Sequence, residues 1–232
     1  MAGRWPDWPL SMCGRFTQDI EEDDLDDLYE LHSKPDGVQA TVRWNGAPTQ
    51  DFLICRTDPD GRRELAPHRW GLVPSWARDP KIGARMINAR SETVDSKPSF
   101  RVAFRRRRCL VPARGWFEWQ RVAGTKQPWW ISLGGEPFSF AGLWEVWNRG
   151  AGPVHSFTIL TCPSTGALEG IHHRQPAVVP RARYDEWLSP GPPTPGMLEL
   201  VRAPNPGPFD LRRVSTAVNS PRNDNPDILR PL

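Results

Sequence analysis

RCLVPARGWFEW, residues 108–119, contains a short apolar run at 109–111 and, after a break around Pro112 and Gly115, an aromatic-rich run that begins at 116 and is expected to continue as a strand to 121. Runs of roughly four to eight such residues bounded by turn residues are typical of β-strands. The same pattern recurs on both sides of this stretch and predicts further strands at residues 52–56, 65–70, 129–133, 138–143, 156–161 and 177–179. The chain is therefore expected to be rich in short strands.

Turns and a few short helices complete the pattern. The dipeptides Asp60-Gly61, Ala123-Gly124 and Gly134-Gly135 have the composition of hairpin turns. Leu25, Leu28, Tyr29 and His32 have helical spacing. Thr17 and the acids after it predict that this helix begins near Thr17 and stops at 34–37. Three more short helices are expected at 100–108, 184–188 and 197–202. Strands with scattered helices predict a single α+β domain.

Composition excludes several classes of protein. The 232 residues are 38% hydrophobic and 25% charged, with a mean hydropathy of −0.57. No run approaches the ~18–20 apolar residues of a membrane span, and residues 1–10 lack the apolar region of a signal peptide. The four cysteines form no C-x-x-C pair, which excludes a zinc ribbon. We expect a cytoplasmic protein with free thiols, no membrane partner, no metal and no cofactor.

Charge is unevenly distributed along the chain. Residues 19–30 contain eight acids and no Lys or Arg, and without them the formal net charge would be +11 rather than +3. All but four of the 30 basic residues are arginine, whose guanidinium binds phosphate through two parallel hydrogen bonds. A genome rich in G and C explains part of this bias, so composition alone makes a nucleic-acid partner plausible without establishing it.

Cys13 follows Met12, a possible translation start. If the mature chain begins at Cys13, this residue has a free α-amine and a thiol on adjacent carbons. The amine has an ordinary pKa of about 8, so part of it is neutral and nucleophilic near pH 7. It can form a Schiff base with an aldehyde, and the thiol can then close a five-membered thiazolidine ring. Taken alone, a single cysteine is more often a small buried apolar residue.

Three other stretches concentrate polar groups. Residues 87–93 include Asn88 and Arg90, which a polar loop would also explain. Glu118 lies between Phe117 and Trp119, and on a strand these aromatics face the opposite side. Partial burial of such a carboxylate raises its pKa towards general acid–base use, although a solvated glutamate at a strand edge fits the pattern too. Residues 171–176 include His172, which suits proton transfer, and no further ligands at metal spacing.

The four stretches, in this order, resemble one family, the SOS response-associated peptidase (SRAP) family, whose members include abasic-site processing proteins. The resemblance runs from Met12 almost to the C-terminus. It is carried by MCGRF at 12–16, WNGAP at 44–48, RWGLVPSWA at 69–77, INARSET at 87–93, RCLVPARGWFEW at 108–119, FAGLWE at 140–145, TILT at 158–161, IHHRQP at 171–176 and VSTAVN at 214–219.

The resemblance implies a single α+β domain with a curved, barrel-like antiparallel sheet and peripheral helices. It implies that Cys13 captures the open-chain aldehyde of an abasic site in single-stranded DNA as a thiazolidine crosslink during a DNA damage response. By the same resemblance, Asn88 positions the cysteine and the sugar, and Glu118 and His172 move protons. The DNA-binding residues would be Arg15, Arg90 and Arg174, which hold phosphates, and Trp76, which stacks on the DNA.

Two further interpretations are consistent with the sequence. A cysteine peptidase would use Cys13 with His172 and Glu118. A non-covalent single-strand binding module would use the basic residues and the 12 tryptophans without chemistry. We interpret residues 1–12 as an extension that is absent from the mature protein, or cleaved off it, and residues 13–232 as the domain. The protein is expected to act as a monomer, associated with the nucleoid if its source is bacterial.

Overall fold

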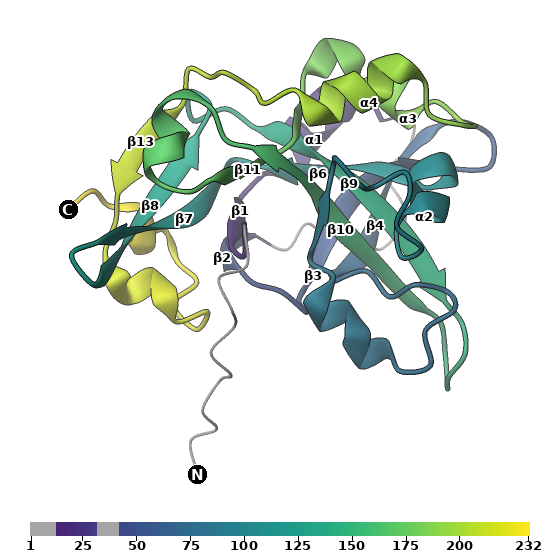
Figure 1. Ribbon diagram of the computed structural model, residues 1–232, viewed down its shortest axis with the longest axis horizontal. Coiled ribbons are helices and arrows are strands. Elements are labelled where there is room, and N and C mark those ends of the chain that lie inside the picture. Colours follow the sequence, from purple (N-terminus) through teal and green to yellow (C-terminus); the bar gives the residue numbers. More distant parts are fainter. Residues whose placement is uncertain (1–12, 32–41) are drawn as a thin grey trace.

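The structure is a computed structural model that describes residues 13–31 and 42–232. Its centre is a closed barrel of five strands (Figure 1), namely β3 (Asp51–Thr57), β4 (Arg63–Trp70), β6 (Arg108–Ala113), β9 (Phe138–Trp147) and β10 (Val154–Pro163). The barrel closes because β10 pairs with β4 on one side and with β9 on the other. Three short strands extend it: β5 (Asn88–Arg90) and β11 (Arg174–Pro176) on β10, and β12 (Val178–Val179) on β9.

A second sheet of five strands lies beside the barrel, on the left of Figure 1. Its order is β13 (Asp210–Arg213), β8 (Thr125–Ser132), β7 (Gly115–Val122), β1 (Phe16–Gln18) and β2 (Arg43–Gly46). The hairpin of β7 and β8 turns at Ala123 and Gly124, which both have positive φ angles of 46° and 83°. This conformation matches the twist of a tight two-residue turn, as the sequence predicted.

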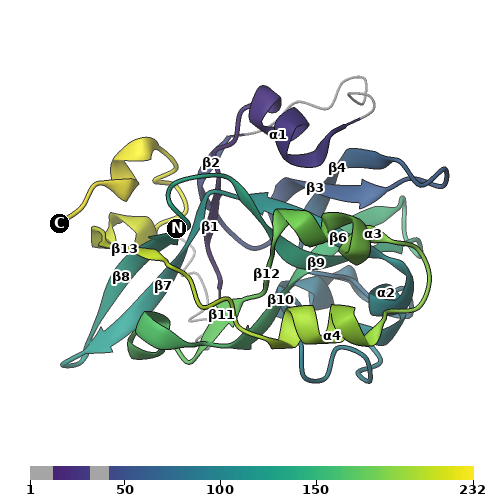
Figure 2. The ribbon, with the colours of Figure 1, turned by 90° about the horizontal axis from the view of Figure 1, so that it is seen from above.

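The helices are short and lie outside the sheets (Figure 2). They are α1 (Glu22–Tyr29), α2 (Arg101–Arg106), α3 (Tyr184–Leu188) and α4 (Pro195–Arg202), with the 3₁₀ turns η1 (Pro80–Arg85), η2 (Gly166–Gly170), η3 (Arg181–Arg183), η4 (Thr216–Asn219) and η5 (Pro226–Leu229). Thr194 caps α4 by accepting a hydrogen bond from the Met197 N–H. The predicted α+β class with a curved, barrel-like sheet and peripheral helices is therefore confirmed.

Side chains alternate between the two faces of the barrel strands, and the two faces contribute to two separate hydrophobic cores. Phe52, Val111, Phe140 and Phe157 join a buried cluster with Phe16 and Trp116 of the second sheet. Their chain neighbours Leu53, Leu110 and Ala141 belong to a different cluster that packs against α1, α3 and α4. Successive side chains of a strand point to opposite faces, so a barrel strand covered on both sides must be apolar throughout. This explains the nearly continuous apolar runs in the sequence.

Two details of the predicted pattern are wrong. Thr17 does not begin a helix, because it lies in β1, where its neighbour Phe16 fills the core, and α1 begins only at Glu22. Gly134-Gly135 is not a hairpin turn. It connects β8 of the second sheet to β9 of the barrel, two strands that do not pair with each other. The predicted position 32 and the helix stop at 34–37 lie outside the described residues, as do residues 1–12.

None of the helices that the structure describes is long and apolar enough to cross a membrane. Likewise, no three His, Cys, Asp or Glu side chains within residues 13–31 and 42–232 are grouped so that they could hold a metal ion.

His68 of β4 makes the fold sensitive to acid. Its side chain is 1% exposed, and its ring packs against Trp144 and His155. Burial, and to a smaller extent Arg56, lowers the pKa of His68 to about 3. The unfolded chain therefore binds more protons than the folded chain between about pH 6.5 and 3, and stability falls as pH drops through this window.

We expect wild-type protein to lose about 2–3 kcal/mol of unfolding free energy to this group between pH 7 and 4.5. His68→Phe removes the titrating ring and should flatten the pH dependence by that amount, as measured by urea unfolding. The exposed His173 supplies the matched control, and His173→Phe should leave the profile unchanged. A profile of His68→Phe that parallels the wild type would contradict the assignment.

Candidate functional site

Cys13 and Glu118 meet at the edge between β1 and β7. The pairing of Phe16 with Trp116, and the hydrogen bond from the Phe117 N–H to the Arg15 carbonyl, align the start of β1 with β7. This alignment places the backbone nitrogen of Cys13 2.9 Å from Glu118 Oε1, which accepts its hydrogen bond. Cys13 is fully buried and has a positive φ of 39°, an uncommon conformation for a residue other than glycine. Two residues 105 positions apart thus form one contact.

Glu118 is a buried carboxylate with a perturbed pKa. Its side chain is 4% exposed, and burial raises its pKa to about 8. The hydrogen bond from the Cys13 N–H acts in the opposite direction and lowers this pKa. Phe117 and Trp119 pack in a separate cluster on the other face of β7, with Trp130 and Trp44. The predicted alternation and the predicted rise in the pKa of Glu118 are both confirmed. A carboxyl group that titrates near neutral pH can both donate and accept a proton.

The thiol of Cys13 is not poised as a thiolate. Burial, and then the negative charge of Glu118, raises its pKa well above the ordinary value. Nucleophilic cysteines of peptidases have the opposite perturbation, because a neighbouring cation stabilises the thiolate. In this site Glu118 is the hydrogen-bond partner of the Cys13 nitrogen, and its charge disfavours the thiolate form of the sulfur.

Asn88 reaches the same residue from the barrel. It lies on β5, in register with Ile159 of β10, and its Nδ2 lies 3.4 Å from the Cys13 carbonyl oxygen. The site therefore lies where the two sheets meet, because the second sheet contributes Cys13 and Glu118 while the barrel contributes Asn88.

His172 lies in the loop between η2 and β11. Gln120, two positions after Glu118 on the same face of β7, donates a hydrogen bond of 2.8 Å to the Gly170 carbonyl and ties this loop to the strand. The Arg174 N–H lies 3.2 Å from His172 Nδ1, and when Nδ1 accepts this bond the neutral ring has its proton on Nε2. Burial is the main cause that lowers the pKa of His172. The hydrogen-bond partners of the His172 ring are the backbone groups of Arg174, and the link from its loop to the strand of Glu118 is the one that Gln120 makes.

The three predicted phosphate-binding arginines differ in their surroundings. Arg174 has a 7% exposed side chain, donates to both carboxylate oxygens of Glu92 and also donates to Thr161. Arg15 is partly buried and donates to Asn45 Oδ1 at 2.8 Å and to the Val218 carbonyl at 2.9 Å. Arg90 is exposed at the end of β5. Arg90 is therefore the most accessible of the three.

Trp76 is 49% exposed in the segment between β4 and η1, and its Nε1 lies 3.5 Å from the Pro98 carbonyl. An exposed indole on the surface is available for stacking on a base, which is the role that the sequence suggested. The roles of Asn88, Glu118, His172, Trp76 and the arginines remain predictions.

Glu92 and Asn45 are partners of site residues that sequence analysis did not assign. Arg174 holds the pKa of the Glu92 carboxyl down at about 2, chiefly through their hydrogen bonds. Asn45 is fully buried and bonds to Arg15. Glu92 lies in the INARSET motif and Asn45 in the WNGAP motif, and this position within a family motif was the one sequence feature that pointed to them. The contact of Glu92 with Arg174 spans 82 positions and that of Asn45 with Arg15 spans 30, so a local sequence pattern could not predict either contact.

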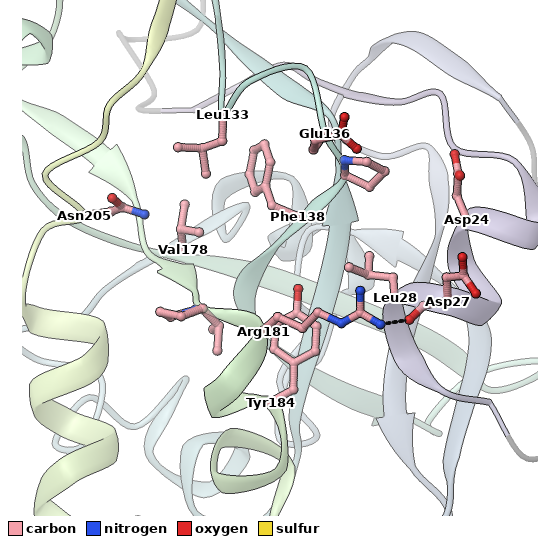
Figure 3. A pocket seen from close by; sticks show the side chains of 13 residues that line it. Asp24, Asp27, Leu28, Leu133, Glu136, Phe138, Val178, Arg181, Tyr184 and Asn205 are labelled. Carbon is pink, nitrogen blue, oxygen red and sulfur yellow. Dashed lines mark hydrogen bonds between the residues drawn. The ribbon is translucent and has the colours of Figure 1, made fainter.

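A hollow of about 470 Å³ lies elsewhere on the molecule, between α1, the connection from β8 to β9, and η3 (Figure 3). Asp24, Asp27 and Glu136 stand around it, with Leu28 and Phe138 among its apolar lining. Arg181 crosses it to bond to the Asp27 carbonyl. None of the predicted site residues lines this hollow.

Fold and site together define a class: a one-domain barrel protein in which a buried cysteine, next to the start of a strand, offers its backbone nitrogen to a buried carboxylate. The family model described as "SOS response associated peptidase (SRAP)" matches residues 12–221. The chain belongs to the SRAP family.

Relatives and solved structures agree with this assignment. The chain is 39% identical over 223 residues to the abasic site processing protein YoqW of Bacillus subtilis, covering 94% of this chain and 99% of that protein. It is 34% identical over 273 residues to the abasic site processing protein HMCES of Pongo abelii, covering 95% and 76%. A phage-related protein of Bordetella bronchiseptica superposes with a TM-score of 0.71 at 30% identity, covering 88% and 95%. A Bacteroides thetaiotaomicron protein superposes with a TM-score of 0.82 at 24% identity, covering 95% and 100%, and supports the fold alone.

Proposed function

We propose that this protein processes abasic sites in single-stranded DNA by forming a covalent thiazolidine crosslink through Cys13. The single observation that carries the proposal is the 2.9 Å contact between the Cys13 nitrogen and the buried Glu118 carboxyl group. Relatives over nearly the whole chain are named abasic site processing proteins, which supports the same substrate.

The chemistry starts from a neutral α-amine on Cys13, which requires that Met12 be absent. The amine attacks the aldehyde carbon of the ring-opened sugar, and loss of one water gives a Schiff base. The thiol then adds across the C=N bond: sulfur bonds to carbon, the proton goes to nitrogen, and the five-membered ring closes. The net reaction releases water and consumes no oxidant or reductant. Because the thiol is held protonated, the amine reacts first.

Each neighbouring group has a role in this scheme. Glu118 takes the proton from the attacking amine and returns it to the departing water, a task that a pKa of about 8 suits. Asn88 orients Cys13 through its carbonyl oxygen. His172, on the loop tied to β7, moves protons during ring opening and crosslink reversal. Arg15, Arg90 and Arg174 hold phosphates, and Trp76 stacks on the DNA, which gives binding without sequence preference.

Substitution of the cysteine tests the proposal directly. Protein that begins at Cys13 should gain the mass of an abasic oligonucleotide and survive a denaturing gel, and Cys13→Ala should abolish this product. Cys162→Ala is the matched control, because Cys162 is also a buried free thiol and should leave the product unchanged. A heat-stable adduct formed by Cys13→Ala would overturn the proposal. A complex with wild-type protein that dissociates on denaturation would instead favour the non-covalent binding module.

A peptidase acting on its own Met12–Cys13 bond is a second candidate, favoured by the same contact. The nitrogen that Glu118 faces is the leaving group of that bond, and a protonated Glu118 could donate a proton to it. In this scheme water is the consumed reactant, the peptide C–N bond breaks, and the product chain starts with the free amine of Cys13. This activity would prepare the chain for crosslinking rather than replace that function.

A further inference from the structure

Two motifs take no part in the chemistry above: WNGAP at 44–48 and VSTAVN at 214–219. The structure brings them together. The side chain of Asn45 is fully buried, and its Nδ2 lies 3.1, 3.0 and 2.9 Å from the carbonyl oxygens of Val218, Ser220 and Asn223. The backbone N–H groups of Trp44 and Asn45 both donate to Asp224. Residues 218–224, here named the C-terminal strap, are thereby fastened to β2.

The oxygen of the Asn45 side-chain amide binds Arg15. Asn45 Oδ1 accepts a hydrogen bond of 2.8 Å from Arg15 Nη1, and the same Nη1 donates to the Val218 carbonyl at 2.9 Å. The second Arg15 nitrogen, Nη2, lies 3.4 Å from the Asn219 carbonyl. Asn45 therefore fixes the guanidinium both by its own oxygen and by the strap carbonyls that it places.

The strap also reaches the strand that carries Glu118. Asn219 Oδ1 accepts a hydrogen bond of 2.8 Å from Trp119 Nε1. Arg15 is two residues after Cys13, and Trp119 directly follows Glu118. The strap therefore contacts the neighbours of both reacting groups, and the Asn45 amide joins it to β1.

We infer that Asn45 is a positioning residue that fixes the C-terminal strap and aims the Arg15 guanidinium at the phosphate beside the lesion. The inference rests on the proposed function, in which Arg15 binds DNA. Only an amide of this length supplies both donors to the strap and an acceptor to Arg15, because Asp lacks the N–H groups and Ser lacks the reach. Hydrogen bonds to a charged group are among the stronger ones in proteins, so the loss of this support should be measurable.

The experiment measures binding without chemistry. Fluorescence anisotropy follows protein starting at Cys13 with a single-stranded oligonucleotide carrying a tetrahydrofuran abasic analogue, which has no aldehyde. Asn45→Ala should weaken binding about tenfold or more, the effect expected for lost hydrogen bonds to a charged group. Arg15→Ala should weaken it similarly, and the double variant should bind no worse than Arg15→Ala alone. A merely structural role for Asn45 would make the two losses add.

Two further variants keep the test decisive. Asn223→Ala removes a half-buried side chain that holds the strap through the Ala217 carbonyl, and it replaces Asn45→Ala in the cycle if that variant does not fold. Asn225→Ala is the matched control, since this side chain caps η5, and it should bind DNA like the wild type. Additive losses, or Asn45→Ala binding within twofold of wild type, would overturn the inference. Wild-type protein that does not bind the analogue would overturn the proposed function as well.

Discussion

Protein that retains residues 1–12 should form no covalent complex with an abasic oligonucleotide, whereas the same chain starting at Cys13 should form it readily. With Met12 in place, the nitrogen that contacts Glu118 is a peptide amide, whose lone pair is delocalised into the carbonyl group and cannot attack an aldehyde. The expected effect is complete loss of product rather than a slower rate. Intact-mass spectrometry of both proteins, mixed with the same oligonucleotide, measures it.

The controls separate the two candidate activities. A chain carrying an additional residue between Met12 and Cys13 cannot expose the cysteine by loss of methionine and should stay inactive. If the full-length chain, incubated alone, loses the mass of residues 1–12, the self-cleaving peptidase is supported, and His172→Ala then tests whether His172 takes part. Irreversible bonding of damaged DNA by full-length protein whose mass is unchanged would contradict the role given to the α-amine.

The candidate site shows what local pattern can and cannot predict. The burial of Glu118 and its raised pKa followed from alternation on one aromatic strand, since a period of two is a property of the strand itself. Its contact with Cys13 did not follow, because it depends on β1, a strand of only three residues that composition could not distinguish from a helix start. Tertiary packing of Phe16 against Phe52 and Trp70 overrode the local preference there.

The same distinction applies to the arginines. Sequence resemblance grouped Arg15, Arg90 and Arg174 as phosphate ligands, yet their electrostatic surroundings differ. Glu92 neutralises Arg174 by a paired hydrogen bond, whereas Arg90 stands exposed at the end of β5. Burial lowers the pKa of Arg15 to about 10, which still leaves the guanidinium charged at neutral pH. Arg174 and Glu92 are 82 residues apart in the sequence, and the pairing of strands decides that they meet. A local sequence pattern does not show which strands pair.

Glu118→Gln should slow crosslinking by roughly 10²- to 10⁴-fold, the usual contribution of a general acid–base group. Glutamine keeps the size of the side chain and still accepts a hydrogen bond from the Cys13 nitrogen, but it cannot take up or release a proton. Single-turnover rates at saturating DNA measure the effect. Glu136→Gln, an exposed glutamate, is the matched control and should react like the wild type. Glu118→Gln that crosslinks within threefold of the wild type would remove Glu118 from the mechanism.

The same substitution should stabilise the fold, and the sign follows from the pKa. In the chain that retains residues 1–12, burial raises the pKa of Glu118 from its ordinary value of about 4.5 to about 8. Between these values the folded state binds more protons than the unfolded state, so wild-type stability falls as pH rises from 4.5 to 8. Glu118→Gln should remove this loss and raise the unfolding free energy at pH 8 by an amount on the order of a few kcal/mol. A carboxyl group that is kept at this cost to stability, and that contacts the nitrogen proposed to become the reacting amine, is expected to be a reacting group rather than a structural one. Lower stability of Glu118→Gln at pH 8 would contradict that interpretation.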